Sequence, residues 1–123
     1  MDSLQVEGIN KELNKFETIG GILGIAIVNS DGLTIFSRLP RAIEDRKFGA
    51  IAATIYGAME AAAFSFKEGL ENMTIHFEDS KLIIMSSETN IIIVVLTELE
   101  IDLGFILLGT EEILKNISNI LRG

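Results

Sequence analysis

Cysteine is absent from this chain of 123 residues, and histidine and proline each occur only once. The lack of cysteine excludes a disulfide framework, a thiolate nucleophile and a sulfur-based metal site. A chain without disulfides suits the reducing cytoplasm, and we expect a cytoplasmic protein. The single histidine, His76, has no evident nucleophile beside it in the sequence. A structural or surface role for this imidazole is therefore favoured over that of a catalytic base.

Positive charge is scarce as well, because ten lysine and arginine residues stand against eighteen aspartate and glutamate residues, for a net charge of -8. This negative field repels phosphate backbones and anionic membrane surfaces, so a nucleic acid partner is not expected. The opening residues Met1, Asp2 and Ser3 do not start a basic region followed by an apolar one. No signal peptide is therefore expected.

One hydrophobic stretch invites comparison with a membrane-spanning helix but is too short. The richest stretch, Ile91 to Leu108, is interrupted by Glu98, Glu100 and Asp102, and its uncharged pieces fall short of the roughly 20 residues of a spanning helix. We therefore expect no direct membrane insertion. Even so, 48% of the residues are hydrophobic and the mean hydropathy is +0.40. We interpret this excess as apolar area reserved for a second subunit or another protein.

Motifs that would indicate an enzyme are missing. The glycines of Gly20 to Gly24 precede or open an expected strand, and no Lys-Ser or Lys-Thr pair follows them. Neither a dinucleotide site nor a phosphate-binding loop fits that pattern. The serines lack the context of a nucleophile elbow, and the acidic loop from Glu98 to Asp102 lacks a calcium-loop pattern. We expect no catalytic residue, no cofactor and no metal ion, and hence no enzymatic activity.

The periodicity of apolar residues predicts a single domain over residues 1–123 that alternates helices and strands. Short separators between the later strands favour an antiparallel sheet, which gives an α/β domain of the α+β type. The predicted elements in order are a helix over Asp2–Thr18, strands over Ile22–Val28 and Leu33–Ser37, a helix over Ile43–Gly69, strands over Asn72–Glu78, Lys81–Ser86 and Ile91–Leu96, and a helix over Asp102–Leu121.

Two of these predictions carry more detail. The continuous apolar run Ile91–Leu96 belongs in the middle of a sheet, whereas the alternating strand Asn72–Glu78 belongs nearer an edge.

The segment Leu103–Leu108 is ambiguous, because it could form a sixth strand before a shorter helix. Its apolar period favours one helix from Asp102, with that residue as the N-cap and two glycines inside the helix.

The long helix carries large residues along one side and small residues along the other. We predict that the large stripe contacts the sheet and that the small stripe forms a helix–helix seam with a second subunit. Alanine is the best helix former, so an alanine-rich surface could need no partner, but that explanation leaves Gly57 and an outward Phe64 unaccounted for. The large stripe is Phe48, Ile51, Ile55, Met59, Ala62 and Phe66, and the seam is Ala50, Ala53, Gly57, Ala61 and Phe64.

An alternating strand at a sheet edge leaves N–H and C=O groups unpaired, and pairing with its copy in a second subunit would satisfy them. The predicted dimer interface therefore also includes Met73, Thr74, Ile75, His76 and Phe77.

A basic cluster lies between the hairpin and the long helix, in a chain that is otherwise acidic. Its members are Arg38, Arg41, Arg46 and Lys47. They are candidate contacts for the acidic loops of a GTPase or, less favourably, for a nucleotide phosphate. The simpler alternative, a solvated connection that balances Glu44 and Asp45, is favoured and stays open.

Taken together, the order of elements, the hairpin Gly21–Leu33, the small-residue helix and the closing helix start Asp102-Leu103-Gly104 resemble the roadblock/dynein light chain family over nearly the whole chain. The resemblance implies a five-stranded antiparallel sheet with the long helix on one face and both terminal helices on the other. It also implies homo- or heterodimers, in which third strands pair and second helices lie side by side.

The resemblance further implies an adaptor or regulator of a small Ras-like GTPase, since prokaryotic members commonly accompany such an enzyme. A non-enzymatic homodimeric regulator is thus our leading expectation. A structural scaffold subunit without effect on nucleotide turnover is the alternative. A weaker third option is a small-ligand sensor with a pocket between the sheet and the terminal helices.

Overall fold

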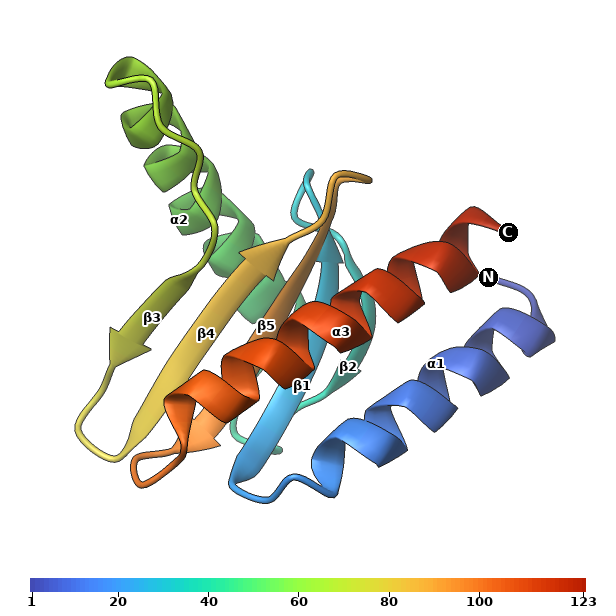
Figure 1. Ribbon diagram of the computed structural model, residues 1–123. Helices are drawn as coiled ribbons and strands as arrows, with labels where there is room; N and C mark the ends of the chain where they lie inside the picture. Colours follow the sequence, from blue (N-terminus) through green and yellow to red (C-terminus); the bar gives the residue numbers. More distant parts are fainter.

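The computed structural model describes all residues, 1–123, and contains three helices and one five-stranded antiparallel sheet (Figure 1). The order of elements, α-β-β-α-β-β-β-α, and the sheet confirm the predicted fold class. The elements are α1 (Ser3–Glu17), β1 (Ile22–Asn29), β2 (Thr34–Arg38), α2 (Asp45–Ser65), β3 (Met73–His76), β4 (Ser80–Ser86), β5 (Ile91–Glu98) and α3 (Leu103–Arg122).

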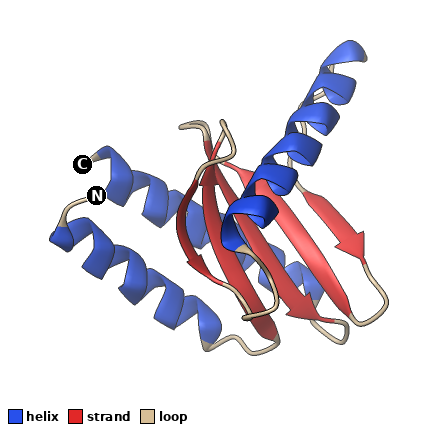
Figure 2. Cartoon of the chain, turned by 180° about the vertical axis from the view of Figure 1, so that it is seen from behind, coloured by secondary structure: helices blue, strands red, loops and turns tan.

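The helices cover the two faces of the sheet unequally. Helices α1 and α3 lie side by side on one face, and α2 crosses the other face alone (Figure 2). A core cluster of 13 buried residues fills the space beneath α1 and α3. The cluster beneath α2 has eight buried residues. The arrangement of layers is the one that the family resemblance implied.

Within the sheet the strand order is β2-β1-β5-β4-β3. Strand β5 is central and almost wholly buried, which confirms the prediction for a strand without alternation. Strand β3 is at an edge and alternates between half-buried and exposed residues, also as predicted. It ends at His76, earlier than expected, because the Phe77 N–H donates to the Ser80 carbonyl and starts the turn into β4 (2.8 Å).

The ambiguous C-terminal segment forms one helix. The Asp102 carboxylate accepts a hydrogen bond from the Phe105 N–H (3.1 Å), which satisfies a donor of the first turn. Helix α3 then continues to Arg122, so the alternative of a sixth strand is excluded.

Helix α2 is shorter than predicted at both ends. The Ile43 N–H closes a turn onto the Pro40 carbonyl, and the helix begins only at Asp45. At the other end Lys67 adopts a positive φ of 63°, and the Glu68 N–H donates to the Ala63 carbonyl. This hydrogen bond is characteristic of the Schellman motif, so the helix ends four residues before Gly69 and does not use that glycine as its cap.

Candidate interaction surface

The side of α2 that faces the sheet is not the predicted one. Its buried residues lie about a quarter turn from the stripe of large residues. Ile51 is 58% exposed, Met59 43% and Phe66 67%, so the prediction that the large stripe forms the sheet contact was wrong for these three residues. Phe48 and Ile55 are partly buried at the border of the contact. The residues that are buried are Gly49, Ala52, Tyr56 and Ala63.

The physical reason is a very close approach between α2 and the β1–β2 hairpin. A Cβ on Gly49 would lie 2.4 Å from Thr34 Oγ1 and 3.4 Å from Val28 Cγ2. A Cβ at the hairpin turn on Gly32 would lie 3.3 Å from the Ala50 Cα. Small residues are therefore needed where α2 crosses the hairpin, whereas further along the helix the large side chain of Tyr56 is fully buried against the sheet.

The predicted seam lies mainly on the surface. Ala50, Gly57, Ala61 and Phe64 are exposed, whereas Ala53 is half-buried near the hairpin turn. Sequence reasoning missed Ile51, Thr54 and Ala58, which form a shallow hollow on α2 together with Ala50 and Ile55. We define the outer face of α2 as Ala50, Ile51, Thr54, Gly57, Ala58, Ala61 and Phe64, all of which are exposed.

Gly57 is the informative residue of this face. A Cβ added at Gly57 would have no neighbouring atom within 4 Å, so nothing inside the chain requires a glycine there. Glycine inside a helix costs about 1 kcal/mol relative to alanine. An exposed glycine with free space around it is thus unfavourable for the isolated chain. A second backbone that approaches this point would account for it.

The C-terminal half of α2 extends past the sheet into solvent (Figures 1 and 2). Between Phe48 and Phe66 the only charged residue is Glu60, and Phe64 is 82% exposed. By length and composition alone the helix could cross a membrane. Within its most apolar stretch, 22% is buried inside the chain. One end of this helix packs on the hairpin, while the other end presents an apolar and nearly uncharged surface.

The edge of β3 provides a second unpartnered surface. The strand pairs on one side with β4, from Met73 opposite Ile84 to His76 opposite Lys81, and has no strand on its other side. Met73 and Ile75 pack against the core beneath α2, while Thr74 and His76 are exposed. Phe77, just beyond the strand, is also exposed. The main-chain groups of this edge are free to pair with another strand.

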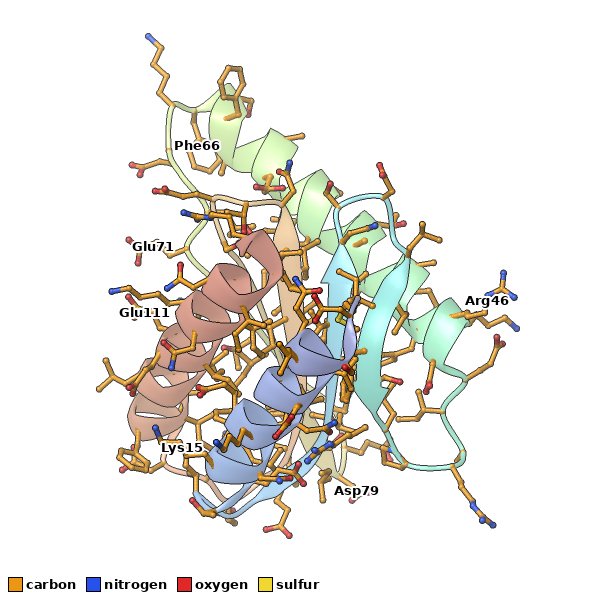
Figure 3. The ribbon with its side chains drawn as sticks, turned by 90° about the vertical axis from the view of Figure 1, so that its right-hand side faces the viewer. Lys15, Arg46, Phe66, Glu71, Asp79 and Glu111 are labelled. Atoms are coloured by element: carbon orange, nitrogen blue, oxygen red, sulfur yellow. The ribbon has the colours of Figure 1, made fainter.

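The basic cluster divides into one engaged residue and three free ones. The Arg38 guanidinium forms a salt bridge with Glu17 and donates hydrogen bonds to the side-chain oxygens of Asn14 (2.9 Å) and Asn10 (2.6 Å). It therefore fastens β2 to α1. The other three are exposed and form no salt bridge, and Arg46 extends into solvent (Figure 3). The free cations are Arg41, Arg46 and Lys47.

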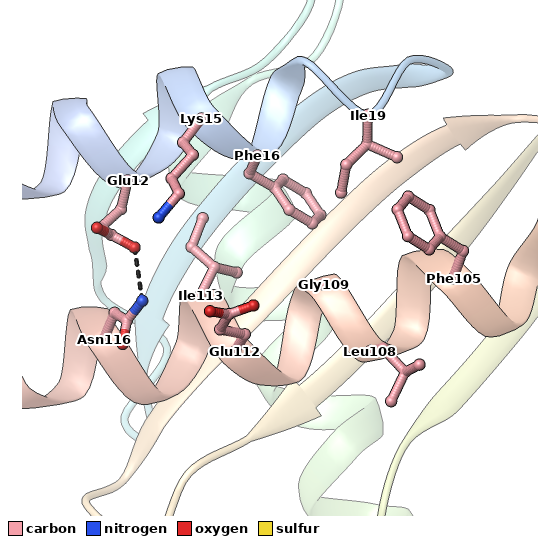
Figure 4. Close-up of a pocket in the computed structure, with 10 residues that line it drawn as sticks. All are labelled: Glu12, Lys15, Phe16, Ile19, Phe105, Leu108, Gly109, Glu112, Ile113 and Asn116. Atoms are coloured by element: carbon pink, nitrogen blue, oxygen red, sulfur yellow. Dashed lines mark hydrogen bonds between the residues drawn. The ribbon is translucent and has the colours of Figure 1, made fainter.

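The other face of the molecule has an apolar pocket of about 280 Å³ between α1 and α3. Phe16, Ile19 and Phe105 surround it, and Glu12 accepts a hydrogen bond from Asn116 at one end (2.8 Å; Figure 4). No group of three or more acidic or histidine side chains is placed to hold a metal ion. The candidate interaction surface is therefore made up of the features on the α2 side that have no partner within the chain: the outer face of α2, the edge of β3 and the three free cations.

Comparison with known proteins shows to which family the chain belongs. The chain belongs to the Roadblock/LC7 domain family, whose model matches residues 9–97. The resemblance inferred from the sequence is thus confirmed.

Two uncharacterized proteins of Methanocaldococcus jannaschii are each 36% identical to the chain over 102 residues, which is 82% of this chain and 86% of the relative. Myxococcus xanthus MglB superimposes with a TM-score of 0.87 at 17% identity, over 99% of this chain and 93% of that one. A solved structure described as MglB with a tetrameric arrangement gives a TM-score of 0.86 at 13% identity, over 98% and 92% of the two chains. At these identities the likeness to MglB concerns the fold.

Proposed function

We propose that two copies of this chain pair through the outer face of α2 and the edge of β3, and that the pair regulates or recruits a small Ras-like GTPase in the cytoplasm without catalysing a reaction itself. The observation that carries the proposal is the exposed outer face of α2, which holds no charged residue and has Gly57 near its middle. The small residues of this face allow another helix to approach closely.

Pairing would relieve two costs of the isolated chain together. It would cover Ile51 and Phe64, which are otherwise exposed to water. It would also give the free N–H and C=O groups of β3 a partner strand. An isologous pair brings the same two surfaces from each copy to one interface. The tetrameric arrangement described for MglB supports self-association of this fold.

The GTPase part of the proposal depends on family membership and on the three free cations. Arg41, Arg46 and Lys47 lie at and just before the start of α2, in a chain whose net charge is -8. Cations that form no salt bridge within the chain are available for acidic loops of a partner. Each copy of the pair would present one such cluster, and the GTPase would bind beside the two long helices.

The test is to purify a Ras-like GTPase encoded beside this gene, and to measure its binding and GTP hydrolysis with and without the chain. We expect binding that differs between the GDP and GTP states, together with a changed rate of hydrolysis. A variant with Arg41, Arg46 and Lys47 all changed to alanine should bind at least about tenfold more weakly. Lys11→Ala with Lys15→Ala on α1, which removes two positive charges from another element, is the charge control.

The outcomes separate the two functions that the sequence left open. Binding without any effect on hydrolysis would favour the structural scaffold. Absence of binding in both nucleotide states would contradict the GTPase proposal, while the pairing of the chain would remain testable by its mass.

A further inference from the structure

A second pocket, larger than the one between α1 and α3, lies on the side of the sheet opposite α2. Its volume is about 680 Å³. Its walls are the C-terminal half of α3, the β4–β5 turn and the segment before β3. Only three of its fourteen lining residues are hydrophobic. The volume is in the range of small-molecule sites, and most of the lining residues are polar or charged.

Ser118 on α3 gives this pocket its chemical character. The residue is only 5% exposed, it lines the pocket, and its hydroxyl has no hydrogen-bond partner. It is the only buried side-chain polar atom of the chain without a partner. A hydroxyl inside a helix commonly donates to the carbonyl four residues earlier, as Thr110 does to Ile106 in the same helix (2.7 Å). An unpaired buried hydroxyl is costly. Its oxygen is shielded from solvent in the free chain, so a molecule bound in the pocket would satisfy it after a change of the Ser118 rotamer.

Two cations flank this hydroxyl on the same side of α3. Lys115 precedes Ser118 by three residues and Arg122 follows it by four, so all three share one helix face. Both cations line the pocket and neither forms a salt bridge within the chain. A hydroxyl between two free cations is suited to a carboxylate, because each cation donates charge-assisted hydrogen bonds.

The acidic residues on the other walls of the pocket limit which further charged groups the ligand can have. Glu71, from the segment before β3, and Glu88, from the β4–β5 turn, line the pocket, as does Glu111 on α3. Figure 3 shows Glu71 and Glu111 on this side of the molecule. Three carboxylates repel a polyphosphate and attract an ammonium group.

We propose that this pocket binds a small zwitterion of the amino-acid class, whose carboxylate contacts Lys115, Ser118 and Arg122 and whose ammonium group faces Glu71 and Glu88. The site lies on the opposite side of the sheet from the outer face of α2. The proposal is independent of the GTPase and of pairing, and its test does not involve either.

The experiment is a titration of the ¹⁵N-labelled full chain, followed by the shifts of its backbone amides in NMR spectra. The probes are glycine, alanine and glutamine, with acetate and methylamine as the two halves of the zwitterion. We expect saturable shifts for at least one amino acid, confined to the pocket walls at residues 70–72, 85–89 and 111–122, and binding at least about tenfold weaker for acetate and methylamine. No saturable shift with any amino acid up to about 10 mM, or equal binding of acetate, would overturn the proposal.

Two variants tie the binding to the named groups. Ser118→Ala should weaken binding about tenfold and leave the unfolding midpoint unchanged or raise it, because the buried hydroxyl makes no hydrogen bond within the chain. Arg122→Gln, at an exposed position, should weaken binding similarly in a folded chain. Ser65→Ala on α2, whose hydroxyl donates to the Ala62 carbonyl (2.6 Å), is the control and should leave binding unchanged. Unchanged affinity in both pocket variants, or a lowered unfolding midpoint for Ser118→Ala, would contradict the assignment.

Discussion

The two faces of the sheet meet their helices in different ways. Under α1 and α3, large side chains such as Ile106 and Ile117 interdigitate and become fully buried. Under α2, the contact is made largely by Gly49, Ala52 and Tyr56, and only a narrow strip of the helix is covered. On the face covered by α1 and α3, packing within the chain accounts for the sequence. The second face leaves most of its helix exposed, and we propose that a partner covers it.

The same difference appears between two glycines of α2. Gly49 is required by the hairpin, since any side chain would collide with Thr34. Gly57, two turns later, has open space around it. One glycine is thus explained within the chain, whereas the other is not. The same kind of substitution in the two regions should therefore change the free energy of unfolding by different amounts.

The largest contrast concerns the two faces as a whole. Ile117→Ala removes a fully buried side chain from the core beneath α1 and α3, and should lower the free energy of unfolding by about 2–5 kcal/mol. Ile51→Ala on the outer face of α2 should change the unfolding of the monomeric chain by less than about 0.5 kcal/mol. Urea unfolding in dilute solution measures both. Equal losses would mean that the two faces are packed equally well.

The glycine pair gives the next contrast. Gly49→Ala would place a Cβ 2.4 Å from Thr34 Oγ1, and the strain should cost about 1–3 kcal/mol. Gly57→Ala meets no atom within the chain and should stabilise the monomer by up to about 1 kcal/mol. The same urea experiment compares them. A destabilised Gly57→Ala monomer would show that the chain itself needs this glycine.

A smaller contrast separates the engaged arginine from a free one. Arg38→Ala removes the bonds that join β2 to Asn10, Asn14 and Glu17, and should cost about 1 kcal/mol because the guanidinium is partly exposed. Arg41→Ala should leave the free energy of unfolding unchanged within about 0.5 kcal/mol. Thermal unfolding of the two variants tests this, and a larger loss for Arg41 would reverse our division of the cluster.

The smallest expected effect is that of salt on pairing. The outer face of α2 contains no charged residue; the charges nearest to it on the helix are Glu60 beside the face, and Arg46 and Lys47 one turn before it. Raising sodium chloride from about 50 to about 500 mM should therefore change the dissociation constant of the pair by less than about threefold, whereas exposed ion pairs would be screened. Sedimentation at both salt concentrations measures this. A strong weakening would mean that charges outside this face hold the copies together.

Much of the fold could be predicted because each element has a clear period. The apolar run of β5 indicated a central strand and the alternation of β3 an edge strand, and both placements were confirmed. The stripe of α3 was sufficient to choose one helix over a strand and a helix. These patterns are local, and burial on one or two faces determines them directly.

The orientation of α2 could not be obtained in the same way. We assumed that large residues face the sheet, but the distance between α2 and the hairpin depends on a tertiary contact between Gly49 and Thr34. That contact puts small residues inside at the hairpin end of the helix and turns Tyr56, rather than the predicted large stripe, toward the sheet. Ile51, Thr54 and Ala58 were missed at the surface for the same reason.

The partners of Arg38 and the unpaired hydroxyl of Ser118 are two further features that were not predicted from the sequence. The polar side of α1 carries Asn10, Asn14 and Glu17 at helical spacing, a signal that could have indicated a partner for Arg38. The unpaired hydroxyl of Ser118 has no such signal, because it depends on how the β4–β5 turn lies against α3. Predicting it requires the assembled fold.

The mass in solution of the wild-type chain and of Gly57→Arg, measured by sedimentation at micromolar concentration, tests the central claim most directly. We predict twice the 13.5 kDa of the chain for the wild type, and a monomer of unchanged helicity for Gly57→Arg, because the variant places an unpaired charge at a close contact. Gly69→Arg, at an exposed position outside α2, is the matched control and should remain paired. A monomeric wild type, or a Gly57→Arg variant that stays dimeric, would contradict the assignment of the outer face of α2 as the seam.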